Sequence, residues 1–486
     1  MDALEESETV VLLMEGNSLH TVQVRPTVKV ANKIHHFHFT CFEAKKMTSC
    51  QQKQQARQAG LEEILSRHPD VAGFNVGYMF DYKPAGVSAG YARVSTQEKM
   101  TPAHYMEAAS LSKTVGTAFA CEYFKARGVS MQAPVNTVLR QCGSPWLITL
   151  PPKAPSHLSA DWPETVTLAQ LVNHTALGMH YVYGLPLSHG MPQTLDFLDG
   201  TLEHAFGYAP LYLEKKPGSS FKYSGGGFIT LQYLVETLEG GEKSITEIMQ
   251  SFLSSCGMHE FTFTPLLPSD TPIAYGQMKK GEEVASHDGG RLAFPALAAG
   301  GLCTPTGLLH LLSHLSKAYR AFEDGDSSFS GPISPETAAF MLGDESLQDL
   351  GSVDFMRSRV GHGVFVAQAG PNKLMLHQAA NEGFRGVYFV CFSGPDRGKG
   401  FVLLCNGDNP AVMAQSEAAR YLLNGTEGLG ITGIDFTQVK SFDMTGLKQE
   451  EIVNLGLKEL VLSGFVQSNG SGSDGGGVFN SSKSKL

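Results

Sequence analysis

Ser110 and Lys113 have the types and the spacing that nucleophilic catalysis requires. They open an apolar, alanine-rich segment that continues to Phe124, and its periodicity predicts one buried helix. Because residues three apart share a helix face, the Lys113 amine can reach the Ser110 hydroxyl. A serine needs such a neighbour, since the high pKa of its hydroxyl leaves almost no alkoxide at neutral pH. The pair therefore predicts a serine nucleophile activated by a lysine.

The position of the pair at the start of an apolar helix favours this chemistry. Burial would lower the pKa of the Lys113 amine toward that of a usable base, and a helix N-terminus favours negative charge at Ser110. The same four-residue pattern recurs at residues 219–222 and 482–485. The first recurrence follows Pro217-Gly218 in a predicted loop, and the second lies in a polar tail. Only Ser110 heads an apolar helix.

Hydrophobic periodicity predicts the elements that position the pair. In chain order these are a helix over residues 55–67, a strand over 72–80, helices over 229–238 and 244–256, strands over 387–392 and 401–405, and a helix over 411–423. The turn-rich residues 393–400 predict that the last two strands form an antiparallel hairpin. This order predicts an α+β fold in which both ends of the domain build one sheet.

The first fifty residues form a predicted extension of this domain. Four valines alternate around Arg25-Pro26, which predicts a short β-hairpin or edge strands; they are Val22, Val24, Val28 and Val30. Four residues of types that bind metals follow, namely His35, His36, His38 and Cys41. The apolar residues between them favour a strand that carries histidines over a metal site.

Charge and composition exclude several classes of function. The net charge is −10 over 486 residues, and no cluster of Lys and Arg suited to phosphates occurs, so we expect no nucleic-acid partner. The longest apolar run near the start, residues 10–14, is far shorter than the ~18 residues of a membrane span. The eight cysteines are scattered without the spacings of a zinc or redox site and are predicted to be reduced thiols.

The last residues carry a targeting signal. Residues 468–486 are rich in Ser, Gly and Asn, and this composition predicts a disordered tail. Its final tripeptide, Ser484-Lys485-Leu486, matches the peroxisomal address that an import receptor binds. We therefore expect location in peroxisomes or a related organelle, with that receptor as a partner.

Several segments of the chain resemble the motifs of one family. Ala108-Ala109-Ser110-Leu111-Ser112-Lys113-Thr114 resembles the nucleophile motif of serine β-lactamase-related proteins, a family of class C β-lactamases, penicillin-binding carboxypeptidases and family VIII-type esterases. Four further blocks resemble the family in order: Leu171-Val172-Asn173-His174-Thr175-Ala176, Phe221-Lys222-Tyr223-Ser224-Gly225-Gly226-Gly227-Phe228, Ala299-Gly300-Gly301-Leu302 and His377-Gln378-Ala379-Ala380-Asn381-Glu382-Gly383-Phe384. The resemblance covers about residues 61–423, and motifs in the right order are more specific than any one of them.

The resemblance implies a β-lactamase/transpeptidase-like fold, in which helices flank an antiparallel sheet and an all-helical subdomain is inserted at about residues 132–315. We expect an N-terminal extension over residues 1–54, which is partly β. The catalytic domain is then expected over residues 55–425, a C-terminal extension over 426–467 and the tail over 468–486.

The resemblance also implies roles for individual residues. Ser110 would be the nucleophile that forms an acyl-enzyme, Lys113 its partner in proton transfer and Tyr223 the second base. The backbone N–H groups of Ser110 and Ala380 would form the oxyanion hole. His377 would line the site from the sheet edge.

Two departures from the family motifs bear on the substrate. Gly225 stands where lactamases have an asparagine that holds the substrate side chain, and His377-Gln378-Ala379 replaces Lys-Thr-Gly. The second change removes the cation that binds a substrate carboxylate. His377, Gly225 and Asn381 are the expected substrate-binding positions. His174 is expected to pack at a helix end and Lys222 to be solvated.

These observations predict a serine hydrolase that acts on an ester, thioester or amide of a small molecule and resembles an esterase more than a true β-lactamase. No metal or organic cofactor is implied, because every required group is a side chain or a backbone amide. An acyltransferase would use the same site and differ only in what resolves the acyl-enzyme. A non-catalytic scaffold that retains the fold is the alternative of another class, with residues 1–50 and 425–467 mediating assembly.

Overall fold

The computed structural model describes residues 9–15, 18–24, 49–180, 184–284, 292–343, 351, 356–437, 439 and 448–466. The chain divides into two compact units, Met1–Ala59 and Gly60–Leu486, and the division falls inside helix α1 (Ser49–Arg67). The predicted tail of residues 468–486, with Ser484-Lys485-Leu486, lies outside the described residues. The predicted domain boundaries stay predictions.

The first unit contains an antiparallel hairpin of β1 (Thr9–Glu15) and β2 (Ser18–Val24). β2 contains Val22 and Val24, two of the four alternating valines, so a strand is confirmed at these two positions, and it pairs with the segment before it. The two residues between the strands are Gly16-Asn17, whose types favour a two-residue hairpin loop. The other members of the predicted hairpin and the histidine and cysteine cluster lie outside the described residues; they are Val28, Val30, His35, His36, His38 and Cys41.

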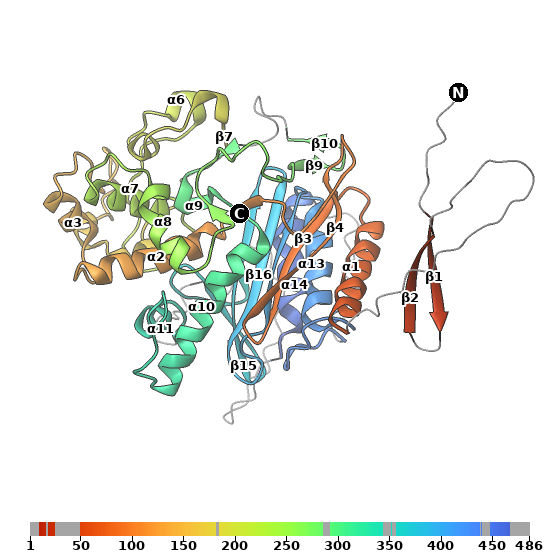
Figure 1. Ribbon diagram of the computed structural model, residues 1–486. Coiled ribbons are helices and arrows are strands. Elements are labelled where there is room, and N and C mark those ends of the chain that lie inside the picture. Colours follow the sequence, from red (N-terminus) through yellow and green to blue (C-terminus); the bar gives the residue numbers. More distant parts are fainter. Residues whose placement is uncertain are drawn as a thin grey trace, which may run out of the picture. The chain divides into compact units, whose positions relative to one another are not determined.

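The second unit is built around an eight-stranded antiparallel sheet of order β13-β14-β15-β16-β17-β3-β4-β5 (Figure 1). Its strands are β3 (Gly73–Phe80), β4 (Lys83–Arg93), β5 (Glu98–Lys99), β13 (Arg359–Val360), β14 (Phe365–Ala369), β15 (Asn372–Asn381), β16 (Phe384–Ser393) and β17 (Gly400–Cys405). The pairing of β17 with β3 confirms that early and late segments build one sheet, and the β16–β17 pair confirms the predicted hairpin.

Both faces of this sheet are covered, so the chain has two apolar layers. Along β16, Val387 and Phe389 join the layer on one side, whereas Tyr388 and Val390 join the layer on the other. A strand that is buried on both faces appears in the sequence as a continuous apolar run without polar alternation, as β16 does.

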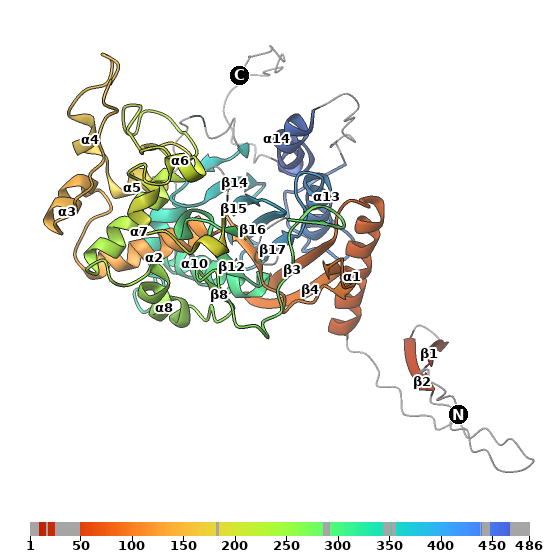
Figure 2. The same ribbon diagram turned by 90° about the horizontal axis from the view of Figure 1, so that it is seen from above.

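Helices lie on both faces of this sheet (Figure 2). On the first face, Leu61 and Ile64 of α1 share a core with α13 (Ala411–Asn424), which contacts α14 (Gln449–Leu460). The C-terminal segment adds Leu429, Ile431 and Phe465 to the same core. On the second face, α10 (Pro305–Asp324) contacts β3, β4, β16 and β17. Helices on both faces of an antiparallel sheet confirm the predicted α+β class.

Most of the other helices lie between α2 and α11 in the chain and to one side of the sheet (Figure 1). They are α2 (Ser112–Ala126), α3 (Val135–Gln141), α4 (Trp162–Thr165), α5 (Leu168–Val172), α6 (Glu203–Phe206), α7 (Gly226–Leu238), α8 (Ile245–Ser255), α9 (Ala296–Ala299) and α11 (Pro335–Leu342). Short 3-10 helices cover Leu187–His189, Thr194–Phe197 and Leu462–Gly464. The predicted helices over residues 229–238 and 244–256 are confirmed as α7 and α8.

Three small sheets complete the unit. One joins β6 (Met106–Ala109), β12 (Gly301–Cys303) and β8 (Phe261–Thr262); the others pair β7 (Leu185–Pro186) with β11 (Leu292–Ala293) and β9 (Gln277–Lys279) with β10 (Glu282–Glu283). The first matters most here, because β6 leads directly into Ser110 and α2. Among the described residues, none of the helices has the length and apolarity needed to cross a bilayer.

Candidate active site

Ser110 lies in the turn between β6 and α2. Ala109, the last residue of β6, has a left-handed backbone with φ +45°, a conformation that costs a non-glycine residue about 1–3 kcal/mol. The Lys113 N–H donates to the Ser110 carbonyl at 3.1 Å, so Ser110 belongs to the first turn that leads into α2. The side chain is nearly buried, with 6% exposed. This strained turn places the hydroxyl at a helix N-terminus, where developing negative charge is stabilised.

Lys113 is fully buried beside this serine. Its Nζ donates to Ser110 Oγ at 3.3 Å and to the carbonyl oxygen of Ala298, in α9, at 2.5 Å. The predicted contact between residues three apart is therefore present. Burial lowers the pKa of the Lys113 amine well below its ordinary value, because the apolar surroundings disfavour the ammonium form.

Tyr223 is the third residue that the structure brings to this place. It lies half-buried in the segment before α7, and the Lys113 Nζ is 4.9 Å from the centre of its ring. The ring of Phe228, in the first turn of α7, lies 5.5 Å from the same atom. The structure thus brings together Ser110, Lys113 and Tyr223, the three predicted catalytic residues.

His377 lies on β15 next to the tyrosine. Its ring centre is 6.0 Å from that of Tyr223, and its Nδ1 donates to the Gln378 carbonyl at 2.7 Å. Burial, with the nearby charge of Lys113, lowers the pKa of His377 to about 3, so the ring is neutral at any working pH. Its Nε2 is buried, and among the described residues it has no hydrogen-bond partner. His377 can therefore accept a hydrogen bond from a ligand but supplies no positive charge.

His174 follows the end of α5, as the helix-end prediction requires, but it also contacts the site. Its ring stacks on Tyr223 with centres 4.6 Å apart and planes 26° apart. Its Nδ1 accepts the Ser224 N–H at 3.0 Å. Burial lowers the pKa of His174 well below its ordinary value. The sequence analysis missed the contact with Tyr223; its one available signal was that both residues lie in family motifs.

The register of β15 with β16 determines which way the Ala380 N–H points. Asn381 and Phe384 pair across a two-residue turn, so they form a hydrogen-bonded pair, and the next pair, Ala380 with Arg385, is non-hydrogen-bonded. The Ala380 N–H therefore points to the other edge of β15. Among the described strands, β14 pairs with β15 only as far as Leu376, so this edge is open at Ala380. The Ala380 N–H is therefore not used in pairing with β16, and its role in an oxyanion hole stays a prediction.

Gly225 and Asn381, two predicted substrate contacts, have N–H donors that bond within the protein, whereas the buried Asn381 Oδ1 has no hydrogen-bond partner among the described residues. The Gly225 N–H donates to the Met179 carbonyl at 2.9 Å, and the Gly225 carbonyl accepts from the start of α7. Asn381 donates from Nδ2 to Glu107 Oε2 at 2.6 Å and to the Ala299 carbonyl at 3.2 Å. The structure therefore does not direct these donors toward a ligand. Instead, Asn381 joins β15 to β6 and α9.

A buried ion pair, which the sequence analysis missed, fixes the turn after Ala380. Arg385 Nη2 lies 2.6 Å from Asp408 Oδ1, and both side chains are nearly buried. The other Asp408 oxygen accepts the Gly383 N–H at 2.9 Å, and Arg385 Nη1 donates to the Asn381 carbonyl at 2.8 Å. The pair thus ties both sides of the β15–β16 turn to the segment after β17.

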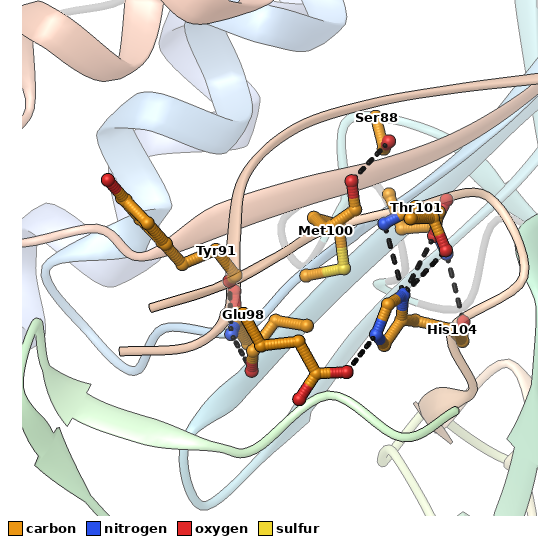
Figure 3. Close-up of polar contacts among 9 residues, drawn as sticks. Ser88, Tyr91, Glu98, Met100, Thr101 and His104 are labelled. Atoms are coloured by element: carbon orange, nitrogen blue, oxygen red, sulfur yellow. Dashed lines mark hydrogen bonds and ion pairs between the residues drawn. The ribbon is translucent and has the colours of Figure 1, made fainter. Parts of the chain in front are cut away.

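A second polar cluster fixes the connector that leads to β6 (Figure 3). His104 Nε2 lies 2.9 Å from Glu98 Oε1, while its Nδ1 accepts the Thr101 N–H at 3.0 Å. The Ser88 hydroxyl of β4 donates to the Met100 carbonyl at 2.9 Å, and Asn75 of β3 donates to the His104 carbonyl at 2.9 Å. These contacts hold residues 98–105 on the sheet and so place the strand that ends at the nucleophile.

Nothing in the described part of the chain forms a metal centre: no group of three or more His, Cys, Asp or Glu residues there could hold an ion. The described cysteines are free thiols, and burial raises the pKa of Cys256 and Cys391 to about 12, which keeps them protonated and unreactive.

A helix-covered antiparallel sheet with a serine and a buried lysine at the start of a core helix defines a class of serine hydrolases. The profile of one such family, Beta-lactamase, matches residues 51–425 of this chain. The chain belongs to this family. In a search of curated proteins, no sequence matches it.

Solved structures share the fold at low sequence identity. D-amino acid amidase from Ochrobactrum anthropi SV3 matches with a TM-score of 0.52 and 16% identity, over 73% of this chain and 92% of the amidase. The β-lactamase/D-alanine carboxypeptidase from Pseudomonas syringae matches with a TM-score of 0.54 and 14% identity, over 78% and 99%. The octameric penicillin-binding protein homologue from Pyrococcus abyssi matches with a TM-score of 0.50 and 19% identity, over 76% and 81%.

Proposed function

We propose that this protein is a serine hydrolase that forms an acyl-enzyme at Ser110 and acts on an uncharged ester, thioester or amide. The observation that carries the proposal is the fully buried Lys113 amine, 3.3 Å from the Ser110 hydroxyl at the start of α2. A buried amine with a lowered pKa is the base that a serine nucleophile needs.

The reaction follows from the positions of these groups. The Lys113 amine takes the proton of the Ser110 hydroxyl as Oγ bonds to the substrate carbonyl carbon, and the carbonyl oxygen becomes an oxyanion. Collapse of this intermediate breaks the bond to the leaving alcohol, thiol or amine, which takes up the proton through Tyr223. Water then adds to the acyl-enzyme, gives one proton to the same bases, and releases the acid as Ser110 regains its hydrogen.

Backbone amides would stabilise the oxyanion. The Ala380 N–H points out of the open edge of β15, and the Asn381 bonds to Glu107 and Ala299 connect this edge to the strand that ends before Ser110. A fixed donor at the developing charge typically contributes about 3 kcal/mol to the transition state.

The charge of the site favours substrates without a carboxylate near the reacting bond. His377 occupies the position of the lysine in the lactamase motif, and its pKa of about 3 leaves it neutral. A neutral imidazole accepts a hydrogen bond but does not form an ion pair with a carboxylate. This argument supports an esterase-like substrate over a β-lactam or a peptide with a free C-terminus. The amidase and carboxypeptidase named above show that the fold supports acyl chemistry of this kind.

Fluorophosphonate labelling followed by intact-protein mass spectrometry tests the proposal. The wild type should gain a single adduct on Ser110 and hydrolyse p-nitrophenyl esters, while Ser110→Ala should lose both. Lys113→Met, which preserves the volume of the side chain, should lower ester turnover by about 10²–10⁴-fold. Addition of an alcohol or an amine to the same assay reports acyl transfer, because a transferase then forms a new ester or amide.

A matched control comes from the chain itself. Ser219 repeats the four-residue pattern with Lys222, but it is exposed and its hydroxyl donates to the Lys216 carbonyl at 2.6 Å. The Ser219→Ala variant should react with the fluorophosphonate and hydrolyse p-nitrophenyl esters at the wild-type rates. A folded wild type that takes no label at Ser110 and hydrolyses none of the esters would refute the proposed function and favour the non-catalytic scaffold.

We also propose that Ser484-Lys485-Leu486 directs the protein to peroxisomes or a related organelle. The tripeptide and the polar segment before it support this proposal. A fluorescent protein fused to residues 468–486 should accumulate in peroxisomes, and the same fusion without Leu486 should stay outside them. Equal distribution of the two fusions would refute the targeting role.

A further inference from the structure

His174 holds the peptide groups on both sides of Tyr223. Its ring Nδ1 accepts the Ser224 N–H at 3.0 Å, and its backbone carbonyl accepts the Lys222 N–H at 2.9 Å. One residue therefore fixes the chain just before and just after the tyrosine. The residue is nearly fully buried, so neither bond competes with water.

The ring of His174 is itself fixed by aromatic contacts. It stacks on Tyr223 at 4.6 Å, and the ring of Phe365, on β14, lies parallel to it at 6.1 Å with an interplanar angle of 10°. Phe221 contacts the same ring edge-on, with centres 5.7 Å apart. These contacts fix the plane of the ring, and within this plane Nδ1 faces the Ser224 N–H.

The backbone at this position is strained. His174 has φ +63°, a left-handed conformation that costs a bulky residue free energy and that Asn and Asp tolerate best. This conformation is common just after the end of a helix, and the Thr175 N–H here bonds back to the Gln170 carbonyl at 3.2 Å, as in such helix ends. Here the conformation lets the carbonyl and the ring of one residue reach two N–H groups that are two positions apart.

From these contacts we infer that His174 is a positioning residue: it holds Tyr223 where its oxygen can exchange protons with Ser110 and Lys113. This inference rests on the proposed function, which makes Tyr223 the second base. The inference requires a neutral His174, because a protonated Nδ1 is a donor and cannot accept the hydrogen bond of the Ser224 N–H. The buried surroundings support the neutral form, because burial lowers the pKa of His174 well below its ordinary value.

Two substitutions distinguish the contribution of the hydrogen-bond acceptor of His174 from that of its aromatic ring. His174→Asn keeps an acceptor atom close to the position of Nδ1 and tolerates the left-handed backbone, whereas His174→Phe keeps an aromatic ring but leaves the Ser224 N–H without its acceptor. We expect His174→Phe to lower kcat by about 100-fold with little change in KM, since a displacement of about 1 Å costs this much. His174→Asn should stay within about tenfold of the wild type.

A double-mutant cycle distinguishes positioning from general loss of structure. If His174 acts through Tyr223, His174→Phe should cost almost nothing further in Tyr223→Phe protein, measured as the rate of Ser110 labelling. The same loss in both backgrounds would overturn the inference, as would equal losses in His174→Phe and His174→Asn. His362→Phe is the matched control, because His362 is also a buried histidine with one hydrogen bond and one stacked ring. Its Nδ1 bonds the Phe340 carbonyl at 2.7 Å, and its ring stacks on the ring of Phe340. The substitution should lower thermal stability and leave kcat unchanged.

A spectroscopic measurement tests whether His174 positions Tyr223 without any measurement of catalytic activity. With 3-fluorotyrosine at position 223, the ¹⁹F NMR spectrum should show one narrow resonance in the wild type and in His174→Asn, and a broadened or split resonance in His174→Phe. An unchanged resonance in His174→Phe would overturn the inference even in a protein that takes no label. Failure of Ser110 to label in the wild type would instead refute the proposed function, so the two failures are distinguishable.

Discussion

The burial of Lys113 predicts a pH dependence of stability that reports directly on its protonation. The unfolded chain holds the lysine proton up to the ordinary pKa of about 10.4, whereas burial lowers the pKa in the folded chain. Between these two values the unfolded state binds more protons, so the free energy of unfolding rises with pH. The rise is about 1.4 kcal/mol per pH unit for one proton, or about 2.7 kcal/mol between pH 7.5 and 9.5 where the folded amine is neutral throughout.

Lys113→Met removes this contribution while filling the same volume. At pH 7.5 the variant should be more stable than the wild type, because the folded wild type bears the cost of a buried, deprotonated lysine that the methionine lacks. The advantage should shrink by about 2.7 kcal/mol at pH 9.5, as the wild type gains stability. Catalytic activity should be lost at both pH values.

Urea unfolding at pH 7.5, 8.5 and 9.5 measures this difference. Ser110→Ala is the control, because it also abolishes activity but keeps Lys113, and so should keep the pH dependence of the wild type. Parallel curves for the wild type and Lys113→Met would mean that Lys113 keeps its proton in the folded protein. That result would refute the reasoning that makes the neutral amine the base.

Three further predictions concern the surroundings of the site. Asp408→Asn, which leaves the Arg385 guanidinium buried without its counter-charge, should cost about 3–5 kcal/mol of stability in urea unfolding; a loss below 1 kcal/mol would contradict the role of the ion pair. Ala380→Pro removes an N–H that points away from β16, so the fold should persist while Ser110 acylation slows by about 10²–10³-fold in phosphonate labelling. Labelling at the wild-type rate would exclude this N–H from the oxyanion hole. Ser244→Ala, at the capping box of α8, should lower stability by about 1 kcal/mol in thermal unfolding without a change in turnover. A loss of turnover there would show that α8 is coupled to the site.

Local contacts of the site could be predicted from the sequence, because they depend on helix periodicity alone. Ser110 and Lys113 lie three residues apart, and the structure shows their side chains in contact. The apolar period of α8 and the long apolar run of β16 likewise report elements that are formed by neighbours in the chain. Tyr223 could be assigned only through the order of family motifs, since no short-range pattern connects it to Ser110.

Contacts between distant segments could not be predicted. The Ala298 carbonyl that accepts from Lys113 lies 185 residues away in the chain, and the His174 ring bonds a backbone N–H 50 residues away. Such contacts depend on how the sheet and helices pack, which hydrophobic periods do not encode. The pairing of β2 with β1 could not be predicted for a related reason, because alternating valines fit a strand equally well with either neighbouring segment.

The four-residue helix α9 gives two parts of the site a common anchor. The carbonyl of Ala298 accepts from Lys113, the proposed base, and the carbonyl of Ala299 accepts from Asn381, the neighbour of Ala380, the proposed oxyanion donor. A displacement of α9 therefore acts on both sides of the proposed site at once, so a substitution in this short helix should affect proton transfer and oxyanion binding together.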